Sequence, residues 1–337
     1  MWDVVTAFSI FLLKIVTVVL AIVFLAWILS KISKKGSNDT ISLEYLNSTY
    51  RKTKHQFLEA FAESGDGLAK EALKKCQEVE KKIEKTRKQN KTETKRYFVL
   101  EFKGDLQASK VKQLREEITA VLNVANIDDE IILQLESPGG AVADYGLAAT
   151  QLARIREKGI QLTVCVDKVA ASGGYLMACL ANKLIAAPFA YIGSIGVVMQ
   201  LPNFHNLLKK CAVDIVEITA GQHKRPLSML GENTLEGKSH MQDKMQAIHE
   251  QFKDHVAKYR PSLALDKVAT GDYWTATYAK DLDLIDEIEA SDSYIQRAIR
   301  DGDVYAVKTA QKPSLKEMLL GKMQSVFYKL LYTRDMG

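Results

Sequence analysis

The sequence has few cysteines, and none of them stands at the spacing of a metal site. Only Cys76, Cys165, Cys179 and Cys211 occur among the 337 residues, and we expect them to be buried free thiols, with no disulfide framework and no metal. A strong charge of one sign is also absent. The net charge of +5 comes without an aromatic-laced basic patch, which argues against nucleic acid as a partner.

A cleavage site is missing after the long apolar run Val4–Leu29, which only Lys14 interrupts. The run exceeds the roughly 20 residues that a membrane-spanning helix needs. We therefore predict a retained single-pass transmembrane anchor at residues 1–30, with membrane lipid as a partner. By the positive-inside rule, lysines directly after the run would place the rest of the chain in the cytoplasm. These lysines are Lys31, Lys34 and Lys35.

Residues 31–95 form a charged region with helical spacing, and Ser64–Gly67 divides it into two helices. We interpret the region as a solvated helical linker, with a partner-binding coiled coil or an anionic membrane surface as alternatives. Residues 301–337 are predicted to be a C-terminal amphipathic tail, whose segment 314–331 could dock on the domain, mediate assembly or lie on a membrane.

Between these regions, residues 96–300 alternate short apolar runs with amphipathic stretches. This pattern is typical of an α/β domain with a largely buried sheet. The uncharged segment 184–201 contains proline and glycine, so we assign it to the domain core and not to a second membrane helix. The expected strands are 97–102, 130–135, 160–166 and 214–219, and the expected helices are 109–124, 144–158 and 233–259.

The domain is organised around residues 167–175, with the sequence D-K-V-A-A-S-G-G-Y. An apolar strand leads into this stretch and a helix leads out, so Ser172 would stand at a helix N-terminus with its hydroxyl exposed. Free N–H groups there favour the negative charge that develops in acyl transfer, which suits a nucleophile. An ordinary helix-capping serine is the alternative.

Three glycine-bearing turns follow strands, at 137–140, 172–174 and 193–196. Glycine lets a backbone N–H approach a ligand closely, so one turn could supply oxyanion donors to a substrate attacked by a serine on another. A catalytic triad is missing, because none of the six histidines lies in these turns. A serine nucleophile still needs a base, and the candidates are Lys224, which is also a plausible surface lysine, and His223 beside it.

The motifs L-E-S-P-G-G at 135–140, V-D-K-V-A-A-S-G-G-Y at 166–175, G-S-I-G-V at 193–197 and G-x-x-K at 221–224 occur in that order. Together they resemble the SppA/SohB family (signal peptide peptidase A-like) of membrane serine peptidases. The resemblance implies a ClpP/crotonase-type fold of repeated ββα units. One departure is Asp283, where the family usually has glycine; aspartate tolerates the left-handed conformation of a helix end.

The resemblance also implies the site: Ser172 as nucleophile, Lys224 as general base and acid, Ser194 as the residue that orients the lysine, and Gly139 and Gly173 as oxyanion donors. No cofactor is implied. A lysine with an ordinary pKa near 10.4 would be protonated. Burial beside apolar walls lowers the pKa of such a group and allows it to act as a base.

The implied function is a membrane-anchored serine endopeptidase of the bacterial cytoplasmic (inner) membrane, acting on signal-peptide remnants or on other membrane-derived or misfolded polypeptides. A homo-oligomer is implied as well. The resemblance favours a periplasmic catalytic domain, whereas the flanking lysines favour a cytoplasmic one, and the two remain open. The alternatives are a catalytically silent membrane scaffold that binds peptides and an acyl-CoA enzyme on the same fold.

Overall fold

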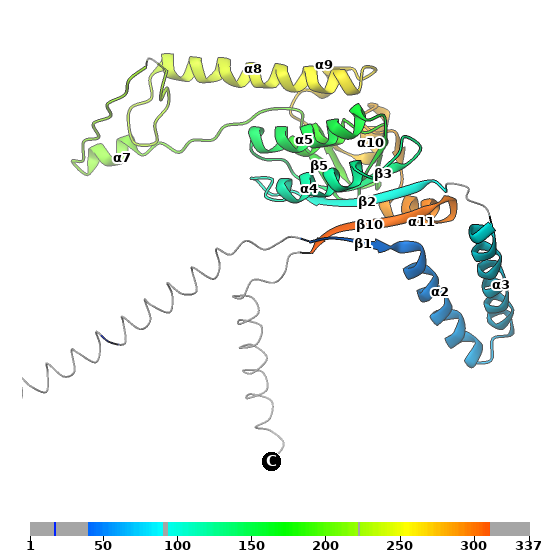
Figure 1. Ribbon diagram of the computed structural model, residues 1–337. Coiled ribbons are helices and arrows are strands. Elements are labelled where there is room, and N and C mark those ends of the chain that lie inside the picture. The colour runs from blue at the N-terminus through cyan, green and yellow to red at the C-terminus, as the bar shows by residue number, and fades with distance from the viewer. Residues whose placement is uncertain (1–16, 18–39, 90–93, 222, 311–337) are drawn as a thin grey trace, which may run out of the picture. The chain divides into compact units, whose positions relative to one another are not determined.

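The computed structural model describes residue 17 and residues 40–89, 94–221 and 223–310 (Figure 1). Within them, the compact unit runs from Leu43 to Lys308. Apart from residue 17, the predicted anchor at 1–30 lies outside the described residues, as does the amphipathic segment 314–331. Across the described part of the chain, no helix has both the length and the apolar character to cross a bilayer.

A seven-stranded sheet forms the centre of the fold, in the order β1-β10-β2-β3-β4-β6-β9. From β10 to β9 all neighbouring strands are parallel. Its middle strands are buried on both faces, which explains their almost continuous apolar sequences. The strands are β1 (Thr40–Tyr45), β2 (Arg96–Lys103), β3 (Glu130–Glu136), β4 (Gln161–Val166), β6 (Lys183–Ala186), β9 (Glu287–Ile288) and β10 (Asp303–Ala310).

Helices cover both faces of this sheet. On one face, α11 (Ser291–Asp301) packs Tyr294 and Ile295 against Tyr97 and Ile132. Because side chains alternate along a strand, the neighbouring positions of β2 and β3 point to the opposite face. That face carries α4 (Val111–Leu122), α5 (Val142–Glu157) and α6 (Gly173–Ala178). The α/β class and the helices predicted at 109–124 and 144–158 are thus confirmed.

A second, three-stranded sheet carries the end of the predicted nucleophile stretch. It consists of β5 (Val169–Ala171), β7 (Tyr191–Gly193) and β8 (Tyr273–Thr275), with β5 parallel to β7 and β7 antiparallel to β8. A bridge between Ser137 and Ala170 joins it to the end of β3. The segment 184–201 contributes β6 and β7 to these sheets, which confirms its assignment to the core as far as Ile195. Its end, with Val198 and Met199, is exposed.

The chain between β7 and β10 contains one long helix, α8 (Leu235–Tyr259), as predicted at 233–259. It begins where the Thr234 hydroxyl accepts the Gly237 N–H at 3.0 Å. The strand predicted at 214–219 is wrong: this segment is exposed and lacks regular structure. Among the described residues no strand pairs with it, so its apolar side chains cover no sheet face. The short helices here are α7 (His205–Lys210), α9 (Leu265–Val268) and α10 (Ala276–Asp281).

Asp283 follows α10 in the left-handed conformation, with φ +58°. This confirms the conformation predicted for the position where the family usually has glycine. The backbone there is held by Arg260, whose guanidinium donates to the Asp283 carbonyl at 2.8 Å and to the Asp286 carboxylate at 2.8 Å. The contact ties the end of α8 to the chain after α10.

Two predicted boundaries are wrong. The linker at 31–95 does contain two helices, α2 (Leu46–Glu63) and α3 (Gly67–Gln89), which confirms the break at Ser64–Gly67. However, it also contributes β1 to the main sheet. The tail at 301–337 begins with β10, which lies between β1 and β2 because Val304 and Ala306 bury their side chains there. The Tyr45 hydroxyl donates to Asp303 at 2.7 Å across this junction.

The expectation for the cysteines is confirmed only in part. All four thiols are free, and those of Cys165 and Cys179 are buried. Burial raises the pKa of both thiols far above the ordinary value, so neither is a nucleophile at neutral pH. Cys211, at the end of α7, is exposed.

If β10 belongs to the core, the Val304→Ala variant should lose about 2 kcal/mol of unfolding free energy, because a fully buried side chain is truncated. Lys308→Ala, on the same strand, removes an exposed side chain that pairs with Glu44 at the surface and should leave the unfolding midpoint nearly unchanged. Thermal unfolding of the full chain in mild detergent measures both. Equal midpoints for Val304→Ala and the wild type would show that the domain ends before residue 303.

Candidate active site

Ser172 lies on a sharp turn between β5 and α6. Its backbone has φ +51° and ψ −119°, a combination that side-chain-bearing residues rarely adopt. The Ser172 hydroxyl does not cap α6, so the alternative of an ordinary capping serine is not realised. Close packing imposes this turn, because a Cβ on Gly173 would lie 2.4 Å from the Tyr145 ring and one on Gly174 2.4 Å from the Ser137 carbonyl oxygen.

Ser194 follows β7 as Ser172 follows β5. The two strands are parallel with Ala171 opposite Gly193, and the Ser172 N–H donates to the Gly193 carbonyl at 2.9 Å. Continuing this register places the two serines opposite each other. Ser194 also has a positive φ, +52°, and its N–H bonds to the Asp272 carbonyl. The structure thus brings both predicted serines to one edge of the small sheet.

Gly139 touches the turn of Ser172. With φ +89°, it sits so close that a Cβ would lie 2.7 Å from both the Gly173 nitrogen and the Ser172 Cβ. Its own N–H, however, donates to the Ser137 hydroxyl at 3.1 Å. Among the described residues, the N–H groups of Gly140 and Gly173 have no hydrogen-bond acceptor. The predicted role of Gly139 as an oxyanion donor therefore stays a prediction. Gly140 becomes an additional candidate donor beside Gly173.

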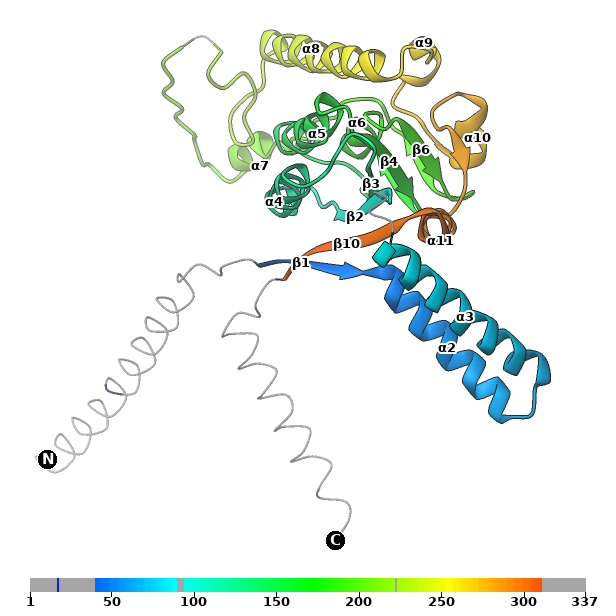
Figure 2. The ribbon, with the colours of Figure 1, turned by 45° about the vertical axis from the view of Figure 1, so that its right-hand side comes forward.

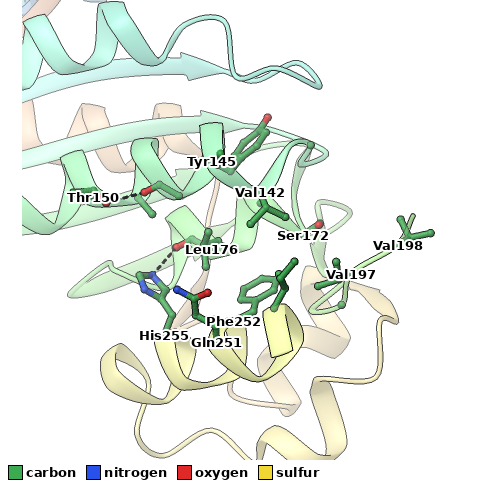
Figure 3. A pocket seen from close by; sticks show the side chains of 17 residues that line it. Val142, Tyr145, Thr150, Ser172, Leu176, Val197, Val198, Gln251, Phe252 and His255 are labelled. Carbon is green, nitrogen blue, oxygen red and sulfur yellow. Dashed lines mark hydrogen bonds between the residues drawn. The ribbon is translucent and has the colours of Figure 1, made fainter. Parts of the chain in front are cut away.

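A cavity of about 470 Å³ opens beside Ser172 (Figure 3). It lies between α5, α6, α8 and the chain after β7, so residues far apart in the sequence share it. Its walls are mainly apolar, and both Gly140 and Gly173 are at its edge. Other lining residues are Val142, Gly146, Ala149, Leu176, Val197, Val198, Ile248 and Phe252.

A histidine also lines this cavity, but not at the nucleophile. His255 of α8 bonds through Nε2 to the Leu176 carbonyl at 3.1 Å, and burial lowers its pKa. A neutral imidazole facing a carbonyl must carry its proton on Nε2. In Figure 3, His255 lies at the end of the cavity away from Ser172, with Phe252 between. This geometry fits a wall of the cavity better than a base for Ser172.

Lys224 does not line the cavity. It is exposed in the loop between α7 and α8, and in both views this part of the chain extends away from the main sheet (Figure 2). The preceding residue, His223, stacks on His240 of α8 with ring centroids 3.9 Å apart. Along the helix, His240 lies about 12 Å from Ile248, the first residue of α8 in the cavity. In this conformation, one chain does not bring the predicted base to the predicted nucleophile.

Comparison with known proteins agrees with these features. The model of "Peptidase family S49" matches residues 154–304, and that of "Peptidase family S49 N-terminal" matches residues 3–152. The chain belongs to peptidase family S49. A "Probable protease SohB" of Haemophilus influenzae is 44% identical over 326 residues, 93% of this chain and 91% of the relative. A protein of the same name from Buchnera aphidicola (subsp. Schlechtendalia chinensis) is 42% identical, over 87% of this chain and 99% of its own.

Membership of family S49 confirms the resemblance seen in the motifs and supports peptidase activity. The structure, for its part, shows what sequence reasoning missed at the candidate site. Ile248, Phe252 and His255 form one wall of the cavity, and their spacing of three to four residues on a predicted helix was the available signal. Gly140 belongs to the motif at 135–140, but only the structure shows that the Gly140 N–H lacks a hydrogen-bond acceptor in the described part of the chain, while the Gly139 N–H has one.

The candidate site depends on close contact between Gly139 and Ser172, so Gly139→Ala should lower the unfolding free energy by about 1–3 kcal/mol through strain at a positive φ. Gly146→Ala is the matched control: this glycine is in the middle of α5 with nothing near its missing Cβ. That change should raise stability by about 0.5–1 kcal/mol. Denaturant unfolding measures both, and equal effects of the two changes would contradict the packing argument.

Proposed function

We propose that this S49 member is a serine endopeptidase in which Ser172 is the nucleophile and Lys224 the general base. The observation that carries the proposal is the strained Ser172 turn at the edge of an apolar cavity, next to two open N–H groups. Strain at a non-glycine residue is costly and is concentrated at functional sites. We also propose the finer fold assignment, a ClpP/crotonase-type fold, on the basis of its two joined sheets.

The chemistry follows from the roles. Ser172 Oγ attacks the scissile carbonyl carbon while its proton passes to the neutral Lys224 Nζ. The lysine ammonium then returns that proton to the leaving amine, the C–N bond breaks, and an acyl-enzyme remains. Neutral Lys224 then takes a proton from a water molecule, which attacks the acyl-enzyme ester. The lysine returns this proton to Ser172 Oγ as the ester bond breaks, which releases the carboxylic acid and restores Ser172. In this scheme Ser194, across the paired strands, orients the lysine.

The negative charge of the tetrahedral intermediate needs donors aimed at one point. We assign these donors to the N–H groups of Gly173 and Gly140, since both residues border the cavity and neither N–H has an acceptor among the described residues. In this assignment Gly139 serves as the spacer that lets the two turns meet.

Lys224 must reach Ser172 for this mechanism, and we propose that it does so in a homo-oligomer, on the site of a second copy. The loop that carries it exposes aliphatic side chains to an unusual degree, with Val216 84% and Ile218 92% accessible. It is also braced internally, since the Asn203 amide donates to the carbonyls of Ser228 and Gly231 at 2.9 and 3.0 Å. A preformed apolar loop of this kind is typical of a surface that another subunit covers.

The substrates we propose are polypeptides that present an apolar side chain to the cavity, such as signal-peptide remnants or other membrane-derived or misfolded segments. The walls contributed by Val142, Leu176, Val197 and Phe252 support this class. An anchor at residues 1–30 in the bacterial cytoplasmic membrane, close to such segments, completes the proposal.

Hydrolysis of casein by the detergent-purified full chain between pH 6 and pH 10 tests the dyad. The wild type should cleave, with a rate that rises with pH as an amine loses its proton. Ser172→Ala and Lys224→Met should both lose activity by about 10³-fold or more. Lys209→Met, on the neighbouring α7, is the control and should cleave normally. Cleavage by Ser172→Ala at the wild-type rate would rule out the dyad, and a wild type that does not cleave would leave the peptide-binding scaffold as the better hypothesis.

Mixing the two inactive variants tests the source of the lysine. If Lys224 acts on a second copy, co-assembled Ser172→Ala and Lys224→Met chains contain some sites with both groups intact. Activity should then return to roughly a quarter of the wild-type value at equal amounts, because random pairing leaves one site in four complete. An active wild type whose variant mixture stays inactive would show that the dyad forms within one chain.

A further inference from the structure

Two buried hydroxyl groups lie directly behind the oxyanion turn and have no part in the proposed dyad. Ser137 directly follows β3 and Tyr145 is in the first turns of α5; neither has any solvent exposure. Their oxygens are 2.6 Å apart. The Ser137 oxygen lies 3.1 Å from the Gly139 nitrogen, and the Tyr145 oxygen lies 2.8 Å from the Asp105 carbonyl oxygen.

The acceptor at one end fixes the direction of all these hydrogen bonds. The Asp105 carbonyl can only accept, so Tyr145 donates to it. Tyr145 then accepts from Ser137, and Ser137 accepts from the Gly139 N–H. Burial raises the pKa of Tyr145, so its proton stays in place at neutral pH. The result is a single ordered series of hydrogen bonds from the Gly139 peptide to the Asp105 peptide.

Surrounding residues pack closely against the two hydroxyl groups of this hydrogen-bond series. A Cβ on Gly104 would lie 2.3 Å from the Tyr145 oxygen and 2.5 Å from the Ser137 oxygen. The Ser137 backbone is paired with β5, donating to Val169 at 2.8 Å and accepting from Ala171 at 3.0 Å. Ser137, which holds Gly139, is therefore attached to β5, the strand that directly precedes Ser172.

We propose that Tyr145 and Ser137 are positioning residues for the oxyanion site. By holding the Gly139 N–H, they fix the peptide that precedes the open Gly140 N–H and set its place relative to Ser172. This inference rests on the proposed peptidase function. Tyr145 also lines the cavity, but its hydroxyl is held by Ser137 and the Asp105 carbonyl. The two hydroxyl groups therefore act through the Gly139 peptide, and they set how well the transition state is bound.

Tyr145→Phe removes only the central oxygen of this hydrogen-bond series. We expect kcat on a fluorogenic peptide to fall about 10- to 100-fold, less than the loss from deleting a donor outright, with KM changed by less than about twofold. The midpoint of the pH profile should not move, because the base is untouched. Tyr294→Phe is the matched control: it removes another buried hydroxyl, bonded to Glu130 at 2.6 Å on the opposite face of the sheet.

The two tyrosine variants should have similar unfolding midpoints, so only a positioning role predicts that their kcat values differ. If Tyr145→Phe does not fold, Ser137→Ala makes the same test, because it removes the acceptor of the Gly139 N–H. Equal kcat values for Tyr145→Phe and Tyr294→Phe would overturn the inference while leaving the dyad intact. A wild type that does not cleave, or cleavage that survives Ser172→Ala, would overturn the proposed function itself.

Discussion

The whole site depends on one close approach, that of Gly139 to the turn of Ser172. No side chain fits between the two, so the turn after β3 and the turn after β5 must meet backbone to backbone. The bridge between Ser137 and Ala170 holds them in register, and the positive φ of Ser172 follows from the same crowding. The proposed nucleophile and the proposed oxyanion donors are thus positioned by packing within the sheets.

Much of the fold could be predicted because its central strands are buried on both faces. β2, β3 and β4 appear in the sequence as apolar runs, and α8 as a long helix. Strands of two or three residues, such as β5 and β8, carry too little pattern to be recognised. β10 was assigned to a tail because its alternation, with Val304 and Ala306 inward, is modest, and only its neighbours β1 and β2 make it part of the sheet.

The residues of the candidate site likewise fall into those that could be predicted from local sequence and those that could not. Ser172, Ser194 and Gly139 were predictable because each follows a strand within a local motif, and parallel strands bring such ends together. The wall formed by α8 depends on a contact between segments about 80 residues apart, exemplified by His255 and Leu176. The placement of Lys224 could not be derived, since a motif gives the identity of a base but not the path of the loop that delivers it.

The place of β10 between β1 and β2 has a consequence for biosynthesis. A ribosome synthesises β1 first and β10 more than 250 residues later, yet the two are neighbours in the finished sheet. Until residues 303–310 emerge, the open edge of β2 has no partner, and β1 has no sheet to join. Unpaired strand edges in a nascent chain invite aggregation. The closing of this edge should therefore be a late step of folding, and it can occur only after residues 303–310 have been synthesised.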